Sequence, residues 1–166
     1  MREIRMSLVE LYYLGTLMEA KYIDYSYIVA MPDIGKQYDL HEQEALAGLE
    51  KAGLIDVDFG GDAEVTDAAR RLAEPVFFGT IETRANLDGQ RNFHAHQGRI
   101  TQARIDGEDI LLASMTDDDL RTALRGRDVS LEQADVEKGY RNVDYTGAEL
   151  AREEGLSKAI AFLKGE

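Results

Sequence analysis

Residues 39–75 read DLHEQEALAGLEKAGLIDVDFGGDAEVTDAARRLAEP, and this stretch decides the expected fold. Asp39, with Glu42 after it, has the spacing of a capping box, which begins a helix. Apolar residues then recur at helical spacing as far as Gly53, a residue that ends helices because it reaches the left-handed conformation easily. We therefore expect a helix over about Asp39–Ala52.

A short hairpin is expected to follow this helix. The run Leu54–Phe59 alternates apolar and acidic residues, as a half-buried strand does. Gly60-Gly61 is a turn pair, and Ala63–Val65 is the expected returning strand. Thr66 is placed to cap a further helix, which we expect Pro75 to limit because proline disfavours helical geometry in the residue before it. Helix, two-stranded wing and helix together predict the back half of a winged-helix unit.

The N-terminal segment supplies the other helices of that unit. Ser7 and Glu10 form a second capping box, which predicts a helix over about Leu8–Ala20. A short helix should follow and end at Met31, because Pro32 comes next. The segment is also rich in tyrosine, which packs in cores and is enriched at protein interfaces.

The periodicity changes after residue 75, where β-branched and aromatic residues become frequent, and Arg99–Ile105 alternates between polar and apolar residues. This pattern predicts an antiparallel meander with turns at Asn86–Gly89 and Asp106-Gly107. Thr116 should cap a closing helix that ends at Gly126. The expected strands are Val76–Arg84, Phe93–Thr101 with Gly98 as a bend, Arg99–Ile105 and Asp109–Met115.

The last part of the chain is acidic and less apolar, and we expect two helices there, Leu131–Gly139 and Thr146–Leu163. The predicted fold class is α+β. Its expected divisions are a domain over residues 1–127, with a winged-helix-like part over 1–75 and the sheet with its closing helix over 76–127, and an acidic helical extension over 128–166.

The charge balance argues against nucleic-acid binding. The chain of 166 residues has a formal net charge of −13, and DNA-binding proteins gain much of their affinity from cations that neutralise phosphates. Lys51 is the only Lys or Arg on the expected Asp39–Ala52 helix, which would be the recognition helix of a winged-helix protein. A transcription regulator with a ligand-sensing β extension therefore stays the alternative function, and a protein partner is favoured.

The sequence also gives little support for enzymatic chemistry. It contains no cysteine, and it lacks the G-x-S-x-G nucleophile motif and both glycine-rich nucleotide-binding motifs. We expect no catalytic residue and no cofactor. No stretch has the apolar length of a membrane span, so we expect a cytoplasmic protein without membrane insertion.

His94 and His96 are the one pair with the geometry of a metal site. They are separated by one residue on a predicted strand, so both side chains should lie on the same face. A metal site needs a third ligand, and no Asp or Glu stands next to the pair in the sequence. A metal-dependent enzyme at these two residues is therefore the weakest alternative, and no metal is expected.

The order of elements resembles a known family. The segments LVELYYLGTLMEAKYIDYSYI, EALAGLEKAGLID, VTDAARRLAEPV, FFGTIETR and NFHAHQGRITQARIDGEDILLASMT, with the closing helix, resemble the EspG family over about residues 7–125. These are cytosolic chaperones of the type VII (ESX) secretion system, with short homologues in Gram-positive bacteria. The resemblance implies a non-enzymatic protein that holds the end of a secreted α-helical protein of the WXG/LXG or PE/PPE-like kind. This chain looks like one half of the longer members, so a homodimer is a further hypothesis.

The residues expected to bind the partner come from the predicted sheet, not from the resemblance. We place them on an exposed sheet face and on the predicted strand that begins near Phe77. They are Phe77, Thr80, Ile81, Phe93, His94, His96 and Arg99.

Overall fold

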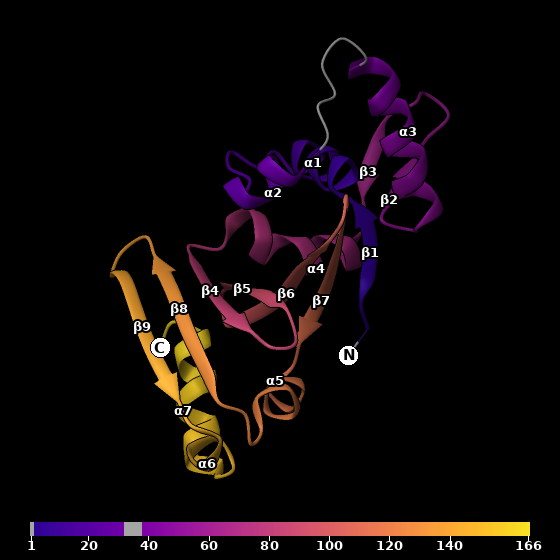
Figure 1. Ribbon diagram of the computed structural model, residues 1–166. Coiled ribbons are helices and arrows are strands. Elements are labelled where there is room, and N and C mark those ends of the chain that lie inside the picture. The colour runs from indigo at the N-terminus through magenta and orange to yellow at the C-terminus, as the bar shows by residue number, and fades with distance from the viewer. Residues whose placement is uncertain (1, 32–37) are drawn as a thin grey trace.

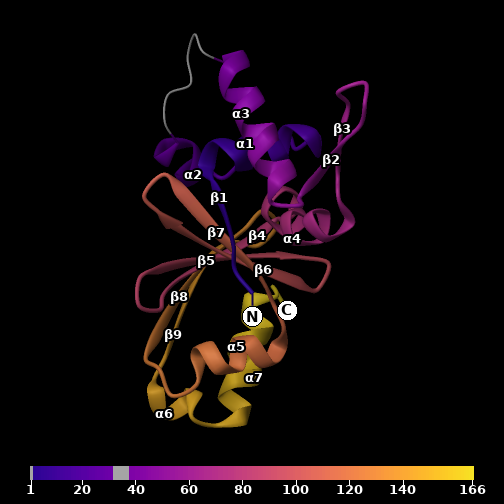
Figure 2. The ribbon, with the colours of Figure 1, turned by 90° about the vertical axis from the view of Figure 1, so that its right-hand side faces the viewer.

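The computed structural model describes residues 2–31 and 38–166, and it confirms the α+β class (Figure 1). One antiparallel sheet of seven strands has the order β1-β7-β6-β5-β4-β8-β9. Figure 2 shows this sheet close to edge-on, with the N-terminal helices on one face and the C-terminal helices on the other. The strands are β1 (Ile4–Ser7), β4 (Ile81–Asn86), β5 (Gln90–His96), β6 (Arg99–Asp106), β7 (Asp109–Met115), β8 (Val129–Asp135) and β9 (Gly139–Tyr145).

Each face of the sheet has its own apolar core. The first core joins one face to α1 (Leu8–Leu17), α2 (Tyr25–Ala30), α3 (Tyr38–Lys51), α4 (Asp67–Phe78) and the separate hairpin of β2 (Ile55–Val57) and β3 (Ala63–Val65). The second core joins the opposite face to α5 (Asp117–Leu124), α6 (Gly147–Leu150) and α7 (Glu153–Leu163). We call these the N-terminal face and the C-terminal face.

Several local predictions in the N-terminal part are confirmed. Ser7 and Glu10 form the expected capping box of α1, and α2 ends with Met31 as its C-cap. The hairpin β2–β3 and the helix capped by Thr66 also lie where the sequence predicts them. The expected capping box of Asp39, and Pro32, lie outside the residues whose side chains the structure describes. The winged-helix description of this part stays a prediction.

The expectation that Pro75 limits α4 is wrong, because the helix continues through it to Phe78. Leu72, Val76 and Phe77 lie on one apolar stripe of α4 and are each at most 8% exposed. Burial of each such side chain contributes roughly 1.5–3 kcal/mol, which together outweighs the cost of about 3 kcal/mol for a proline inside a helix. The predicted strand Val76–Arg84 is therefore wrong in its first half, and β4 begins only at Ile81.

The predicted single strand Phe93–Thr101 is in fact the end of β5, a tight turn and the start of β6. The turn falls at Gln97 and Gly98, whose φ angles are 50° and 75°. Two successive positive φ values are typical of the two-residue hairpin turns that match the strand twist. The bend expected at Gly98 is thus a complete reversal of the chain. The predicted strand over Asp109–Met115 and the helix capped by Thr116 are confirmed.

The predicted helix Leu131–Gly139 is wrong, because this segment forms β8 and the turn into β9. Side chains of β8 alternate strictly between buried and exposed from Val129 to Asp135, which is the two-residue period of a strand. β8 pairs with β4, so the C-terminal segment extends the main sheet and is not wholly helical. The second predicted helix is confirmed in part, as α6 and α7 separated by a short break.

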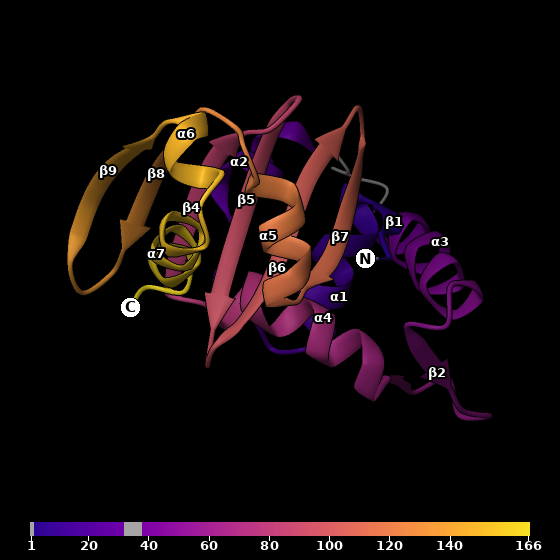
Figure 3. The same ribbon diagram turned by 90° about the horizontal axis from the view of Figure 1, so that it is seen from below.

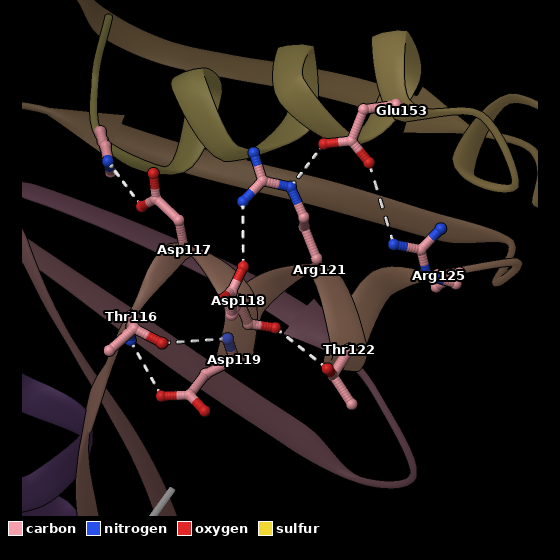
Figure 4. A network of polar contacts seen from close by, with 9 residues as sticks. Thr116, Asp117, Asp118, Asp119, Arg121, Thr122, Arg125 and Glu153 are labelled. Atoms are coloured by element: carbon pink, nitrogen blue, oxygen red, sulfur yellow. Dashed lines mark hydrogen bonds and ion pairs between the residues drawn. The ribbon is translucent and has the colours of Figure 1, made fainter.

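Charged residues join the helices on the C-terminal face (Figure 4). Arg121 of α5 lies 2.6 Å from a carboxylate oxygen of Glu153 at the start of α7, and it also contacts Asp118. Thr116 and Asp119 form the capping box that begins α5. The Asp117–Asp119 cluster therefore stabilises a helix start and an ion-pair network, as its position after a capping residue predicts.

Strand β1 was not expected, because a four-residue stretch before a capping box shows little periodicity. It forms by pairing with β7, from Ile4 opposite Leu112 to Ser7 opposite Asp109. Among residues 2–31 and 38–166, no helix has both the length and the apolar composition that a membrane span requires.

Candidate functional site

A hollow lies on the N-terminal face, between the segment that leads into α2, the end of α4 and the turn from β8 to β9. It has a volume of about 680 Å³. Tyr22, Phe78 and Val136 line it, and their exposed fractions are 81%, 38% and 77%. Large apolar side chains that remain this exposed around one cavity are typical of a binding surface. We call this cavity the groove.

The sheet continues beyond the groove, and no helix among residues 2–31 and 38–166 covers this part of its N-terminal face. On β8 and β9 the side chains that share the N-terminal face are exposed, among them Glu132, Ala134, Tyr140 and Asn142. The opposite side chains of the same strands pack on the C-terminal helices, as Leu131 does at 0% exposure. Figure 3 shows α6 and α7 near these strands on that side, with β9 at the edge of the sheet. The hairpin β8–β9 is therefore covered on one face only.

A buried polar chain lies where α2 meets β5, and its member His94 lines the groove. The Tyr27 hydroxyl lies 2.6 Å from Nε2 of His94 and accepts a hydrogen bond from Nδ2 of Asn92 at 3.2 Å. Both Tyr27 and His94 are at most 3% exposed. Burial lowers the pKa of His94 to about 4 and raises that of Tyr27 well above its ordinary value. Both side chains are therefore neutral near pH 7.

Two carboxyl groups, of Glu82 and Asp24, lie next to His94 and also line the groove, and we call these three residues the floor of the groove. Burial, together with the hydrogen bond and the charge of Asp24, raises the pKa of Glu82 to about 8 against the effect of Arg84. Burial also acts to raise the pKa of Asp24, but hydrogen bonds from Glu82 and Ser26 outweigh it and leave that pKa below its ordinary value. Near pH 7 the Glu82 carboxyl therefore keeps its proton and donates a hydrogen bond to the Asp24 carboxylate.

Backbone geometry brings these groups together. Asp24 is the N-cap of α2, where its side chain accepts a hydrogen bond from the backbone N–H of Ser26. Glu82 on β4 lies directly opposite His94 on β5 in the antiparallel register. One ligand atom from each of Asp24, Glu82 and His94 lies within 4.8 Å of the others. Two carboxyl groups and one imidazole at this spacing can share protons or hold a cation.

The structure divides the residues that the sequence predicted for partner binding. Phe77, Thr80 and His94 line the groove. Phe77 lies on α4 and not on the expected strand, and a Cβ at Gly15 of α1 would stand 2.9 Å from its ring, so the helix packs closely over it. The predicted strand of Phe77–Ile81 is therefore wrong, although part of it contributes to a cavity.

The other predicted residues are not part of one exposed face. Phe93 is fully buried on the C-terminal face, with Ile81 packed at the margin of the same core. Arg99 is paired with Glu74 of α4 at 2.6 Å, and His96 is partly buried on the N-terminal face. The expected exposed face around Phe93 and His94 is wrong, because helices cover both sides of β5.

The sequence analysis did not identify Asp24, Tyr27 or Glu82. A signal for Glu82 was present, because the turn at 87–89 sets a register that pairs Glu82 with His94 and Arg84 with Asn92. No comparable signal existed for Asp24 and Tyr27, which reach the strand only through the packing of α2 on the sheet.

No protein-family model and no curated protein matches this chain. The fold and the groove define the class of protein as an α+β protein with a two-sided sheet and an apolar-rimmed cavity over a buried polar cluster. The resemblance of residues 7–125 to EspG chaperones stays a prediction.

Proposed function

We propose that the chain is a non-enzymatic cytosolic adaptor, of the EspG-like kind, that holds the end of a secreted α-helical protein of a type VII secretion system. The observation that carries this proposal is the apolar rim of the groove beside an uncovered half of the sheet. Contact of a contiguous apolar surface with water is unfavourable, so such a surface is typical of a site that a partner covers.

The composition of the rim supports a polypeptide ligand. Tyr22, Phe78 and Val136 supply large apolar area around the cavity, and Tyr140 adds a further exposed ring on the neighbouring strand β9. Aromatic side chains with a polar end are enriched at protein interfaces. The tip of a helical hairpin presents a few large apolar side chains, and these suit a cavity of about 680 Å³.

The uncovered sheet face extends this surface away from the groove. Exposed side chains of β8 and β9 lie in line with the cavity, so a partner seated in the groove would also contact Ala134, Tyr140 and Asn142. A small apolar centre with a polar surround is the usual composition of an interface.

The transcription-regulator alternative has less support. Among residues 41–51 of α3, the exposed charged side chains are Glu44, Glu50 and Lys51. A surface with more carboxylates than cations repels the phosphate backbone.

The test is to purify the tagged full chain from its native host and identify bound proteins by mass spectrometry. A secreted helical-hairpin protein should be recovered with the wild-type chain, and its recovery should be lost with the double variant Tyr22→Ser, Val136→Ser. Phe59→Ser is the control, because Phe59 is also a highly exposed apolar residue, and the hairpin β2–β3 that carries it lies at the other end of the molecule from β8 and β9 in Figures 1 and 3. Retention of the partner by the double variant would overturn the proposal.

A homodimer is a separate part of the proposal, based on the likeness to one half of longer chaperones. Sedimentation velocity of the purified chain should show a dimer at high micromolar concentration, and a strict monomer there would remove this part alone.

A further inference from the structure

The Asp24, Glu82 and His94 cluster has a feature that the adaptor role does not use. Its three potential ligand atoms come from three different elements, the N-cap of α2, β4 and β5, and lie within 4.8 Å of one another. All three residues line the groove, so an ion can enter from solvent. In the described part of the chain, this is the one group of at least three such residues close enough to share an ion.

We propose that Asp24, Glu82 and His94 form a site for a divalent transition-metal ion of the Zn²⁺ or Mn²⁺ class in the floor of the groove. The ligand set favours this class, because an imidazole nitrogen suits transition metals, whereas Mg²⁺ and Ca²⁺ prefer ligand sets made of oxygen atoms. Three protein ligands leave at least one coordination position for water or for a group of a bound partner.

The surroundings of His94 resemble the support that metal-ligating histidines receive. Nε2 lies 2.6 Å from the Tyr27 hydroxyl, so we expect an ion to be bound through Nδ1. Asn92 in turn donates to the same hydroxyl, so the orientation of the imidazole is held from behind. Hydrogen bonds of this kind to the second nitrogen set the ring orientation and strengthen metal binding.

The two carboxyl groups are also oriented by neighbours. The backbone N–H and the hydroxyl of Ser26 both donate to Oδ1 of Asp24. Nε of Arg84 lies 3.2 Å from Oε1 of Glu82. Each carboxyl group thus has one oxygen engaged by these neighbours, and an ion would replace the hydrogen bond that joins the two carboxyl groups.

The charge of the cluster favours a cation. Asp24 and Glu82 lie close together in a partly buried site, and in the described part of the chain Arg84, which is nearly half exposed, is the cationic side chain paired with Glu82. Without an ion, the two carboxyl groups avoid repulsion by sharing a proton. A divalent ion can take the place of this proton and bind both carboxylates.

The site differs from the metal pair considered from the sequence. His96 shares a face with His94, but it does not belong to the cluster. The other two proposed ligands are Glu82 on β4 and Asp24 at the start of α2. His96→Gln is therefore a matched control, since it removes an imidazole on the same strand and face without touching the proposed ligands.

The test uses the full chain after treatment with EDTA and removal of the chelator. Isothermal titration with ZnCl₂ and with MnCl₂, in physiological salt and excess Mg²⁺, should show one saturable site, and Co²⁺ should give visible absorption bands typical of nitrogen and oxygen ligands. The excess Mg²⁺ suppresses diffuse binding to a chain with a net charge of −13.

Asp24→Asn and Glu82→Gln should each weaken binding by at least tenfold, and Tyr27→Phe by roughly tenfold through the lost support of His94. His96→Gln should bind as the wild type does. Circular dichroism of each metal-free variant separates lost binding from lost folding. Absence of saturable binding at millimolar metal, or equal loss in His96→Gln, would overturn the site and leave a proton-sharing pair. This assay uses no protein partner, so its failure leaves the adaptor proposal intact.

Discussion

Strand β5 and the hairpin β8–β9 belong to one sheet but differ in how they are covered. In β5, the neighbours Phe93 and His94 point to opposite faces and are both at most 3% exposed. In β8 every second side chain is exposed, because helices cover the C-terminal face alone. Polar side chains of β5 therefore need hydrogen-bond partners within the protein, whereas those of the hairpin can face water or a second protein.

The largest effect is expected from Phe93→Ala in the doubly covered strand. The ring is fully buried against the C-terminal helices, so its removal leaves a cavity and should lower the free energy of unfolding by about 3–5 kcal/mol. Urea denaturation followed by circular dichroism measures this loss. A loss below 1 kcal/mol would mean that β5 is not enclosed on that face.

A paired test on β8 should show its one-sided cover. Leu131→Ala removes a fully buried side chain and should cost about 2–5 kcal/mol. Glu132→Ala on the exposed face should change stability by less than about 0.5 kcal/mol. Equal losses in the two variants would contradict the uncovered face and, with it, the surface proposed for the partner.

Tyr27→Phe tests the polar partners that β5 requires on the N-terminal face. The change removes a hydroxyl that contacts both His94 and Asn92 and leaves these buried groups without it. We expect a loss of about 1–3 kcal/mol in the free energy of unfolding. Tyr140→Phe on the exposed hairpin removes a hydroxyl that contacts Glu132 in solvent, and it should have little effect.

The smallest expected effect is a pH dependence that arises in the floor of the groove. The folded chain raises the pKa of Glu82 from 4.5 to about 8, so it keeps a proton that the unfolded chain loses. The free energy of unfolding therefore falls as the pH rises from 4.5 to about 8. His94 acts in the opposite direction, but only between its folded pKa of about 4 and its ordinary value of 6.5.

Above pH 6.5, His94 no longer changes the stability, so of these two residues only Glu82 should lower it as the pH rises. Urea midpoints at pH 6.5 and pH 8, measured with EDTA present, should differ for the wild type and converge for Glu82→Gln, which keeps a neutral side chain. The same slope in the variant would assign the effect to other groups.

Local signals were sufficient for much of the fold. The capping residues Ser7, Thr66 and Thr116 each mark a helix start, because a cap is made within one turn of chain. The apolar run within Asp109–Met115 and the turn glycines are likewise signals that lie within a few residues. At Pro75 the local preference for a helix end is overridden, because burial of Val76 and Phe77 favours a helix that continues to Phe78.

The candidate site was predicted only in part. The sequence drew attention to His94 through its spacing from His96, whereas the structure places His94 beside Glu82 and Asp24. The apolar rim was missed as well, because Tyr22 and Val136 are far apart in the sequence and meet only at the groove.

By itself, the sequence determined the α+β class, the helix starts, the turns and the acidic surface, since each depends on residues within a few positions of one another. Tertiary structure alone decided that residues 129–145 become strands, because β8 is stabilised by pairing with β4, and that α2 carries Asp24 to the floor of the groove. Contacts between distant segments stabilise the fold in ways that no local sequence pattern shows. Here they make residues 129–145 part of the sheet and bring Asp24, Glu82 and His94 into one cluster.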